Sequence, residues 1–521
     1  MSDIIGNTTI GELWQDAACT YANKTFLVFE AVDGSKQSYS YGSFYAQICR
    51  SANLFYSCGI RQGDMVLMQL CNSAEFLMVF FGLNLIGAVV VPLASKSSQH
   101  ELQQALLVCK PKWAVVNAEH VQAYSEIAKA GEYLCGGVFT VNSKGKVSSI
   151  KQANILDFNA KLSGASDSVP PTTVTDNMQL AELLFTSGTT AAPKAVMITH
   201  ANLVFSGIYG NWQTSMRSDD RLLSTMPACH SNFQMAALMP VLVAGATLIL
   251  VERYSASRFC SQLRRHRATI TQLISMMVRT LLLQPPKADD AQNDLREALY
   301  FMPLSDVEKN AFEQRFNARL MNTYGSTETI GWAVTDSPFG KRCWPSVGKA
   351  GLGYEVGIFN GDGKEVQPGE VGEFRVKGIA GRTLALGYYQ QPELSAQIID
   401  KNGWMRTGDK GYMNADGWFY FCDRQANIIK RAGENVSATE VETVLCEHPD
   451  ISEAAVIGVH DELRDEAVKA FVLPVSGAFL DKEEIKQWCA SKLASYKIPT
   501  EIEFVSEFPR TVSMKIEKRL L

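Results

Sequence analysis

In two segments of the chain, hydrophobic residues that favour a helix are followed by a few small residues and then by hydrophobic residues that favour a strand. Residues 76–93 are almost wholly apolar, and three consecutive valines follow shortly after Gly87. Residues 235–251 repeat the arrangement, with Ala-Gly-Ala before Thr-Leu-Ile-Leu-Val. Each pattern predicts a buried helix, a glycine cap and a buried strand. Helices that feed buried strands twice predict two doubly wound αβαβα layers, which we place in residues 45–180 and 181–335.

The first of these apolar runs is also about as long as the ~18 residues that can signal a membrane-spanning helix. Asn84, Gly87 and Pro92 interrupt it, and its second half is β-branched. A buried helix followed by a buried strand explains the run better. We therefore expect no membrane span.

The rest of the chain predicts two further units. Residues 348–420 consist of short apolar stretches between turn formers such as Asn-Gly-Asp-Gly, which is typical of a β-rich subdomain. The last hundred residues alternate between helical and strand patterns, which predicts a small α+β domain. Its predicted helices are 438–446 and 481–493, and its predicted strands are 454–459 and 467–473. The expected fold is therefore α/β, with a large N-terminal domain over residues 1–423 and a small C-terminal domain over residues 424–521.

A polar loop over residues 186–194 has the composition of a phosphate-binding site. Its sequence, Thr-Ser-Gly-Thr-Thr-Ala-Ala-Pro-Lys, places four hydroxyls, a glycine and a lysine between the apolar runs 181–185 and 195–198. Both runs predict strands, so the loop lies at the tip of a hairpin. A Walker loop would instead open a helix. Ser, Thr and Pro also favour ordinary surface turns, so the composition alone leaves both interpretations open.

Four later segments combine residue types that can bind a nucleotide or transfer charge. Residues 324–329, Tyr-Gly-Ser-Thr-Glu-Thr, offer a ring for adenine and a carboxylate for magnesium. Asp409 follows a Thr-Gly turn and suits two sugar hydroxyls. Residues 423–435 place cations and a glycine at the domain boundary, and Lys515 lies near the C-terminus. Each segment taken alone is also consistent with a turn or a solvated surface.

Composition excludes several classes of protein. The 521 residues include 49 basic and 54 acidic side chains with no dense basic run, so we expect a small-molecule substrate and no nucleic acid. Twelve cysteines without Cys-x-x-Cys, and a start without a secretory leader, predict reduced thiols and a cytoplasmic protein. Seven scattered histidines include no His-Glu-x-x-His, so a zinc site is not supported.

Taken in order, the five motifs resemble those of the adenylate-forming enzymes, which include acyl-CoA synthetases, luciferase and the adenylation domains of peptide synthetases. The resemblance covers essentially the whole chain. It implies an AMP-forming acyl-CoA ligase in which a carboxylate and ATP give an acyl-adenylate and pyrophosphate, and coenzyme A then gives the thioester and AMP. It also implies that the small C-terminal domain rotates between the two half-reactions.

The resemblance assigns roles to particular residues of this chain. ATP and Mg²⁺ would bind at the loop, with Thr186 and Glu328 on the metal. Tyr324 would pack on adenine, Asp409 and Arg424 would face the ribose, and Lys515 would join the substrate carboxylate to the α-phosphate. Lys430 and Gly433 would flank the passage for the pantetheine of coenzyme A. The remaining implied nucleotide-binding residues are Ser187, Gly188, Thr189, Thr190, Lys194 and Thr327.

Phrases outside the shared motifs resemble the crotonobetaine/carnitine-CoA ligases, among them Lys341-Arg342-Cys343-Trp344-Pro345-Ser346. This implies carnitine, crotonobetaine or γ-butyrobetaine as the acid, whose trimethylammonium group is held best by aromatic faces and a nearby carboxylate. The sequence does not identify that carboxylate. His230 would be the gate beside the acyl site. The candidate acyl-site residues are Tyr209, Trp212, His230, Phe233, Gly325 and Trp332.

Several positions depart from the family pattern. Ala191 and Ala195 replace glycines of the loop and must keep φ below zero or accept strain. Met514 replaces the glycine before the terminal lysine; if that position requires a positive φ, methionine should impair the placement of Lys515. Ala426 replaces the charged hinge residue. The bulky segment 300–304 replaces a small-residue, glycine-rich segment and should narrow the pocket against long fatty chains.

Three other hypotheses stay open. The protein could activate another short or medium-chain carboxylic acid. It could instead adenylate an acid for a carrier protein, although no carrier-attachment region follows Lys515. A nucleotide-binding regulator that has lost turnover would explain Met514 and the two loop alanines, but the retained Lys194, Glu328, Asp409, Lys430 and Lys515 argue against it. Homo-oligomerisation is undecided.

Overall fold

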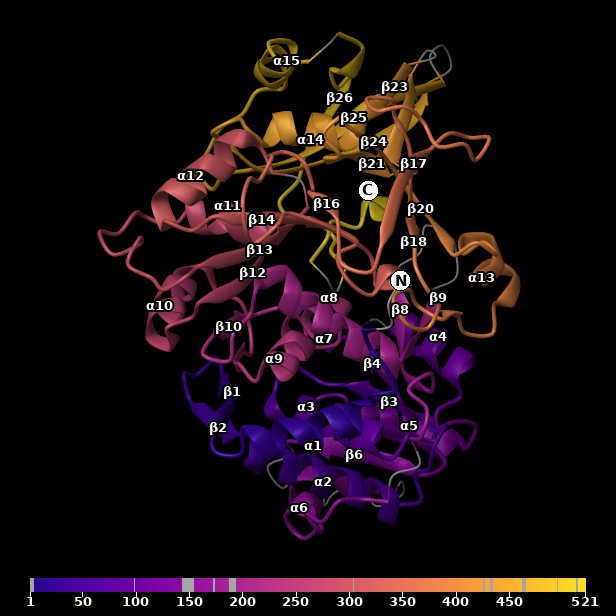
Figure 1. The fold of residues 1–521 in the computed structure, drawn as a ribbon. Helices are drawn as coiled ribbons and strands as arrows, with labels where there is room; N and C mark the ends of the chain where they lie inside the picture. The colour runs from indigo at the N-terminus through magenta and orange to yellow at the C-terminus, as the bar shows by residue number, and fades with distance from the viewer. Residues whose placement is uncertain are drawn as a thin grey trace.

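The computed structural model describes residues 4–97, 99–142, 154–171, 174–186, 194–302, 304–424, 427–431, 434–461, 465–493, 495–511 and 514–521. Within these ranges, two large sheets form the body of the molecule, a smaller antiparallel sheet lies against them, and another sheet belongs to the C-terminal region (Figure 1). The expected mixed α/β fold is thus confirmed.

The first large sheet is parallel in its centre. In spatial order its strands are β16 (Lys349–Ala350), β15 (Val334–Thr335), β14 (Leu320–Tyr324), β13 (Glu297–Phe301), β12 (Ile270–Ile274), β10 (Arg221–Ser224), β11 (Thr247–Val251), β1 (Thr25–Glu30) and β2 (Lys36–Ser40). The pairs from β14 to β11, and the pair of β11 with β1, are parallel. The carboxyl ends of β10, β12, β13 and β14 therefore open at one edge.

The second large sheet contains the predicted loop hairpin. In spatial order its strands are β19 (Gly387–Tyr388), β9 (Lys194–Thr199), β8 (Leu180–Thr186), β4 (Val89–Leu93), β3 (Met65–Gln69), β5 (Trp113–Asn117), β6 (Gly137–Val141) and β7 (Ile155–Asp157). The antiparallel pair β8–β9 places Thr186 opposite Lys194, as the hairpin prediction requires. Ala195 lies buried in β9 and is not among the residues with positive φ.

Helices cover and separate the two sheets. The longer ones of the N-terminal region are α1 (Ile10–Thr20), α2 (Tyr41–Ser57), α3 (Ala74–Leu85), α4 (Gln99–Cys109), α5 (Val121–Ala130), α7 (His200–Thr214), α10 (Ala256–His266), α11 (Ser275–Leu282) and α12 (Asp306–Phe316). The short ones are α6 (Phe158–Ser163), α8 (Ser231–Phe233), α9 (Met239–Ala244) and α13 (Pro392–Ile398), and a π-helix spans Gln234–Leu238. One continuous hydrophobic core includes residues of both sheets and of α2, α3, α7 and α9.

The two apolar segments fold as their patterns predict. α3 is buried at every residue except Glu75, and the hydroxyl of Ser73 caps its start by accepting from the amide of Phe76 at 3.1 Å. Gly87 then takes φ 71° before β4. Asn84 is tolerated in this apolar helix because its side-chain amide donates to the carbonyl of Phe80 at 2.8 Å. In the second segment Gly245 takes φ 65° before β11, and the helix ahead of it is split by the π-helical turn.

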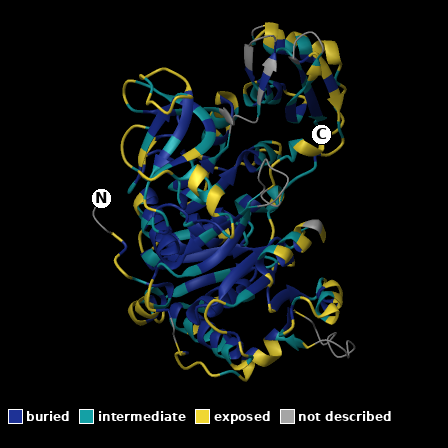
Figure 2. Cartoon of the chain, turned by 90° about the vertical axis from the view of Figure 1, so that its right-hand side faces the viewer, coloured by how far each residue is buried: buried dark blue, intermediate teal, exposed yellow. Residues whose placement is uncertain are grey.

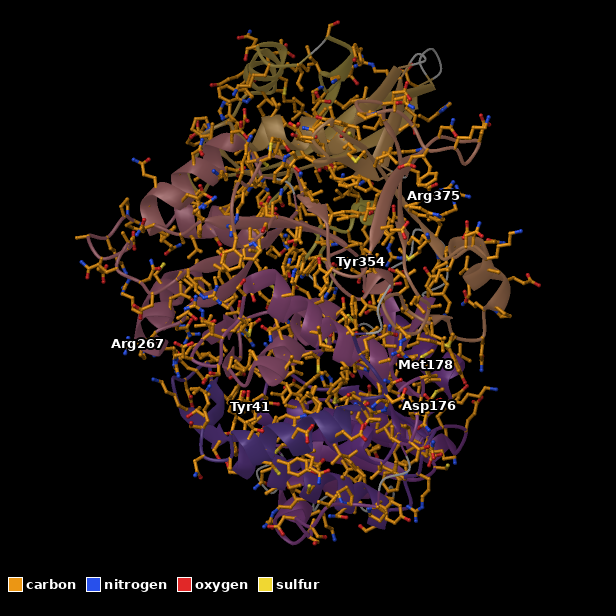
Figure 3. The ribbon with its side chains drawn as sticks, viewed as in Figure 1. Tyr41, Asp176, Met178, Arg267, Tyr354 and Arg375 are labelled. Atoms are coloured by element: carbon orange, nitrogen blue, oxygen red, sulfur yellow. The ribbon has the colours of Figure 1, made fainter. Side chains whose placement is uncertain are left out.

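The predicted boundaries of the two layers were wrong. The hairpin β1–β2, from residues 25–40, joins the first sheet through β11, while β8 and β9 join the second sheet although they fall after residue 180. Tyr41 links these parts, because its buried hydroxyl donates to the carbonyls of Val241 at 3.0 Å and Ala246 at 2.8 Å (Figure 3). Such long-range strand pairing has no signal in local periodicity.

The β-rich subdomain and the C-terminal region follow the sequence closely. The subdomain sheet has the order β17 (Glu355–Phe359), β18 (Gly372–Lys377), β20 (Trp404–Met413) and β21 (Phe419–Arg424). The C-terminal sheet has the order β23 (Glu434–Ser437), β22 (Ile428–Arg431), β25 (Asp465–Pro474) and β24 (Ile451–Asp461), with β26 (Glu501–Phe504) also on β25. Helices α14 (Ala438–Cys446) and α15 (Lys482–Ala490) cover it and share its separate core (Figure 2). The chain leaves one sheet at Arg424 and enters the other at Ile428.

Glu182 is a fully buried carboxyl group in the middle of β8. Burial raises its pKa from 4.5 to about 8, and the neighbouring Gln234 side chain offsets part of this rise. The folded protein therefore keeps a proton at neutral pH that the unfolded chain loses. Stability from this group is present below pH 4.5 and is lost as pH rises toward 8.

We predict that Glu182→Gln, which is neutral at every pH, is more stable than the wild type at pH 8. The gain in Tm should be roughly 10 °C, because a rise in pKa from 4.5 to about 8 costs about 4 kcal/mol at pH 8 and 1 kcal/mol corresponds to roughly 2–4 °C in large domains. Thermal unfolding of both proteins between pH 5 and 8 measures it. The two curves should converge at the acidic end, and a constant separation would show that Glu182 stays ionised in the fold.

Candidate functional site

The site lies where parallel strands of the first sheet end together. The register pairs Ile274 at the end of β12 with Phe301 at the end of β13, and Tyr300 with Asn322 of β14. The segments that leave these ends are 225–230, 275–277, 301–302 and 325–329, and all four line one cleft. Ligands of open α/β sheets bind outside the carboxyl ends of the strands, so the topology places the site here.

The cleft is large and lies between the N-terminal body and the C-terminal region. Its volume is about 3200 Å³. Thr186 and Lys194 of the hairpin, Asp409 of the subdomain and Lys515 of the C-terminal region all line it. Four of the five motifs, separated by up to 329 residues between Thr186 and Lys515, are thus brought to one cavity.

Tyr324 and Asp409 form a direct pair within the cleft. The Tyr324 hydroxyl donates to Asp409 Oδ2 at 2.6 Å, a short and charge-assisted hydrogen bond. The Tyr324 ring lies 4.8 Å from Phe374 and 6.0 Å from Phe421, centroid to centroid. In the register of β20 with β21, Asp409 stands opposite Arg424. A flat ring beside a carboxylate suits a nucleoside, whose base can stack while its ribose donates hydroxyls.

Glu373, a residue that the sequence did not single out, supports the turn before Asp409. Its side chain is almost completely buried and accepts from the amide of Gly408 at 3.3 Å and from Arg406 Nε at 3.2 Å. Gly408 takes φ 73°, a conformation that glycine adopts at little cost. Glu373 and Gly408 together orient Asp409 toward Tyr324. Glu373 lies on β18, so only strand pairing could have revealed this role.

Tyr388 connects two of the predicted residues and was also missed. Its hydroxyl donates to Glu328 Oε1 at 3.0 Å, and Lys194 Nζ lies 5.3 Å from its ring centroid. A cation over a ring face is attracted by the ring quadrupole. Thr327, adjacent to Glu328, shares a hydroxyl hydrogen bond of 3.1 Å with Ser231. The motif 324–328 is therefore tied both to the hairpin and to the segment after β10.

Thr186 and Glu328 suit the metal that the sequence resemblance implies. Both line the cleft and offer oxygen donors, which the hard cation Mg²⁺ prefers. No cluster of three or more His, Cys, Asp or Glu side chains with metal-binding geometry occurs in the part of the chain that the structure describes. Mg²⁺ typically uses one or two carboxylates together with substrate phosphates and water, so this sparse donor set fits it.

His230 and Lys515 both line the cleft, and the charge of Lys515 acts on the His230 ring. His230 is the N-cap of α8, and its Nδ1 accepts from the amide of Asn232 at 3.1 Å. Burial first, and the positive charge of Lys515 second, lower the pKa of His230 from 6.5 to about 4. The imidazole is therefore neutral at physiological pH. The same proximity shows that the C-terminal region holds Lys515 inside the cleft in this structure.

The loop that carries Lys515 is strained at one residue. Met514 takes φ 64°, so the position does require the left-handed conformation. The Met514 amide donates to the carbonyl of Thr511 at 2.9 Å, and the Thr511 amide donates to the carbonyl of Lys515 at 2.8 Å. Arg510 holds the loop from outside, donating to the carbonyl of Met514 at 3.1 Å and pairing with Glu453 at 2.5 Å. These bonds keep the methionine in a conformation that glycine would adopt freely.

The structure separates the predicted acyl-site residues into two groups. Tyr209, His230, Gly325 and Trp332 line the cleft. Trp212 and Phe233 do not: Trp212 lies on the outer side of α7 with 41% of its surface exposed, and Phe233 is completely buried in the core. The structure therefore does not bring these two side chains to the cleft with the others. Both lie on helices, where a shift of one or two positions changes the face on which a side chain lies.

Some predicted residues cannot be placed. Ser187, Gly188, Thr189, Thr190 and Gly433 lie outside the described residues, as do Ala191 and Ala426. Arg424 is the last residue of β21, and Lys430 lies in β22. The structure describes only the backbone of each. The roles expected of these residues stay predictions.

A cleft at the carboxyl ends of parallel strands, facing a C-terminal region that carries a lysine, is the arrangement expected of the adenylate-forming class. Comparison with known proteins agrees. Residues 14–389 match the model of the AMP-binding enzyme family, and residues 440–515 match that of the AMP-binding enzyme C-terminal domain. The chain belongs to the AMP-binding enzyme family.

Curated relatives and solved structures extend the comparison. The chain is 42% identical over 528 residues to a crotonobetaine/carnitine–CoA ligase of Salmonella arizonae and 41% identical over 522 residues to one of Citrobacter koseri, with full coverage of both chains in each case. It is similar in fold to the anthranilate CoA ligase AuaEII in complex with anthranoyl-AMP, with TM-score 0.87, 24% identity, and coverage of 99% of this chain and 96% of that one. O-succinylbenzoate coenzyme A synthetase of Bacillus subtilis in complex with AMP matches with TM-score 0.81, 26% identity and coverage of 98% and 97%.

We predict that Met514→Gly increases the rate of adenylate formation. Glycine removes the steric cost of the left-handed conformation, about 1 kcal/mol, which corresponds to roughly a fivefold gain in kcat/KM. ATP–pyrophosphate exchange measures this half-reaction. Met514→Ala is the matched control, because it removes the long side chain but keeps Cβ and the strain. An equal gain in both variants would attribute the effect to side-chain bulk.

Proposed function

We propose that the protein is an AMP-forming acyl-CoA ligase that activates carnitine, crotonobetaine or γ-butyrobetaine. Two observations support the proposal. The relatives with this named activity match over the full length of both chains. The cleft also brings the hydrogen-bonded pair Tyr324 and Asp409, which suits a nucleoside, together with Lys515 and a neutral histidine.

The first half-reaction joins two anions. The substrate carboxylate attacks the α-phosphorus of ATP, the bond to the bridging oxygen breaks, and pyrophosphate leaves. Neither reactant needs deprotonation, so the protein must align the groups and neutralise charge. Lys515 lies where it can bind both the carboxylate and the α-phosphate, while Lys194 can hold the departing phosphates. Mg²⁺ bound by Thr186 and Glu328 would neutralise further charge on the phosphates.

Neutral His230 supports this step by leaving the positive charge to Lys515. A protonated imidazole beside the ammonium would add a like charge, and burial of the ring prevents it. In the second half-reaction the thiolate of coenzyme A attacks the acyl carbonyl, and AMP leaves with the bonding electrons. We infer that rotation of residues 424–521 withdraws Lys515 and presents the strand around Lys430 for that step.

The setting of the protein follows from its co-substrates. ATP and coenzyme A are supplied in the cytoplasm, and each of the twelve cysteines is free of a disulfide. Among the described residues, no helix has the length and hydropathy needed to cross a bilayer. We therefore propose a cytoplasmic ligase whose partners are ATP, coenzyme A and a betaine acid, and its oligomeric state is undecided.

A second candidate substrate is another short carboxylic acid. Phe301 and Trp332 narrow the acyl end of the cleft, which disfavours long fatty chains but would also admit a small apolar acid. ATP–pyrophosphate exchange with L-carnitine, crotonobetaine, γ-butyrobetaine, acetate and octanoate separates the two. Exchange with the betaines, followed by thioester formation with coenzyme A, is expected. Exchange with octanoate or acetate alone would refute the betaine assignment, and exchange with none would leave a nucleotide-binding regulator.

We predict that Lys515→Ala lowers the rate of pyrophosphate exchange at least 10²–10³-fold, the usual effect of removing one group that stabilises transition-state charge. The rate of thioester formation from preformed acyl-adenylate should not change, because Lys515 has no part in that step. The matched control is Lys486→Ala on α15, whose lysine pairs with Glu483 and is not among the residues that line the cleft. Equal losses in both half-reactions would show that Lys515 has a structural role.

A further inference from the structure

Two aromatic side chains form one wall of the cleft at its acyl end. Phe301 ends β13, and its ring stacks on Trp332 with centroids 4.8 Å apart and an interplanar angle of 16°. Both side chains are partly exposed, and both line the cleft. The two rings therefore present a continuous aromatic surface to a bound acid. Both rings pack against the edge of the hydrophobic core but stay partly exposed, whereas Phe233 is completely buried in it.

Trp332 is held rigidly from behind. The hydroxyl of Tyr209 donates to its backbone carbonyl, and the Tyr209 ring packs 5.7 Å from that of Tyr354, which lies near the centre of the molecule (Figure 3). The chain also passes very close to Gly325, where an added Cβ would lie 3.0 Å from the Trp332 Cα and 2.5 Å from the Gly331 carbonyl oxygen. Gly325 thus contributes to the wall by allowing this approach.

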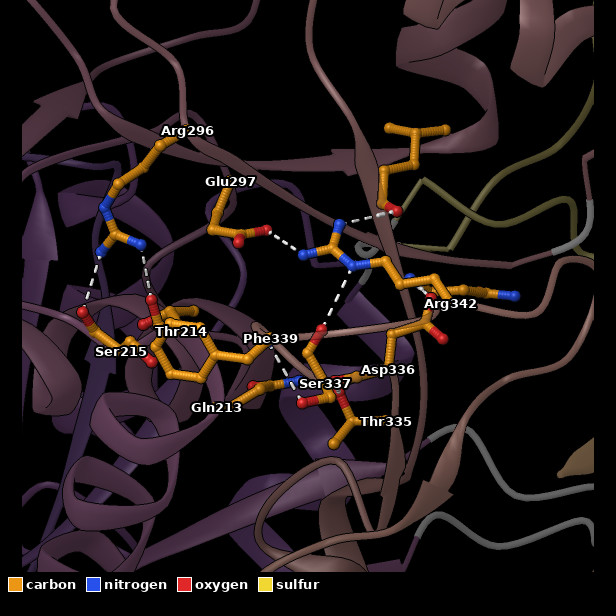
Figure 4. Close-up of polar contacts among 12 residues, drawn as sticks. Gln213, Thr214, Ser215, Arg296, Glu297, Thr335, Asp336, Ser337, Phe339 and Arg342 are labelled. Atoms are coloured by element: carbon orange, nitrogen blue, oxygen red, sulfur yellow. Dashed lines mark hydrogen bonds and ion pairs between the residues drawn. The ribbon is translucent and has the colours of Figure 1, made fainter. Parts of the chain in front are cut away.

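The helix that carries Tyr209 is itself anchored to the sheet. At the end of α7, Gln213 donates to Thr335 Oγ1 at 2.8 Å, and Arg296 donates to the carbonyl of Thr214 at 2.7 Å (Figure 4).

Met302, next to Phe301, takes φ 94°, which a side-chain-bearing residue adopts only at a cost. Backbone strain of this kind persists where the surroundings impose it and clusters at functional sites.

The wall consists mainly of aromatic and apolar side chains and contains no carboxylate of its own. Residues 274–277, 301–302 and 330–332, which form it at the strand ends, include no Asp or Glu. The nearby carboxylates of Asp306 and Glu328 belong to other segments of the cleft, where Asp306 accepts from the Trp344 indole at 2.7 Å and Glu328 accepts from Tyr388. At the wall itself a trimethylammonium group would therefore meet mainly aromatic and apolar side chains. Cation–π attraction is strongest where the cation is desolvated.

We propose that the stacked pair Phe301 and Trp332 is the receptor for the quaternary ammonium group of the acid and determines the preference for a charged over a neutral chain. This inference rests on the proposed function. The acid would extend from Lys515, which holds its carboxylate, toward the Trp332 face. Recognition would not depend on an ion pair, so the preference should change little with ionic strength.

The test compares γ-butyrobetaine with 5,5-dimethylhexanoate, in which carbon replaces the quaternary nitrogen without a change of shape. The readout is KM for each acid in ATP–pyrophosphate exchange. Trp332→Leu should raise KM for γ-butyrobetaine roughly 5- to 30-fold and leave KM for the neutral acid nearly unchanged, since cation–π contacts of buried cations have this strength. Trp332→Phe should fall between the wild type and the leucine variant.

Site-specific replacement of Trp332 by mono-, di- and trifluorotryptophan gives a second readout that does not perturb packing. Fluorine withdraws charge from the ring face, so KM for γ-butyrobetaine should rise with each fluorine. Phe339→Leu, whose side chain is 71% exposed and is not among those that line the cleft, is the control and should change neither KM. Equal losses for both acids, or a flat fluorine series, would overturn the receptor assignment while the wild type still activates betaines. Failure of the wild type to activate any betaine would overturn the proposed function as well.

Discussion

The architecture depends on one constraint, the common direction of the parallel strands in the first sheet. Because β10, β12, β13 and β14 run the same way and neighbours lie about 4.8 Å apart, the residues that follow their ends must share one edge. Tyr324, Phe301, Ile274 and the segment leading to His230 become neighbours for that reason alone. Around this edge lie the hairpin with Thr186 and Lys194, the subdomain with Asp409 and the loop with Lys515.

Neutral side chains as well as charged ones contact the ionic groups of the cleft. Tyr324 donates to Asp409, Tyr388 donates to Glu328 while its ring faces Lys194, and buried His230 stays uncharged beside Lys515. Hydroxyls and a ring face thus contact Asp409, Glu328 and Lys194 within the cleft. Met302 and Met514, whose backbones are strained, both line this cleft.

Much of the fold could be predicted from the sequence because it follows from local patterning. The apolar runs around Gly87 and Gly245 fold as predicted, α14 coincides with its predicted range, and the hairpin of β8 and β9 was correctly inferred. The layer boundaries failed because β1 pairs with β11 across more than two hundred residues. Trp212 and Phe233 do not line the cleft with the other candidates, because helix packing, and not spacing, decides which face of a helix meets the cleft.

Residue types and their order along the chain were enough to predict the chemistry: hydroxyls and a lysine for phosphate, an aromatic ring and a carboxylate for a nucleoside, and a lysine near the C-terminus for charge neutralisation. Such motifs can be identified without knowing how the chain folds. Which side chains contact one another could be known only from the folded structure. Strand pairing and ring stacking between segments distant in the chain bring Tyr388, Glu373 and the Phe301–Trp332 pair to the cleft. Such contacts have no local signature in the sequence.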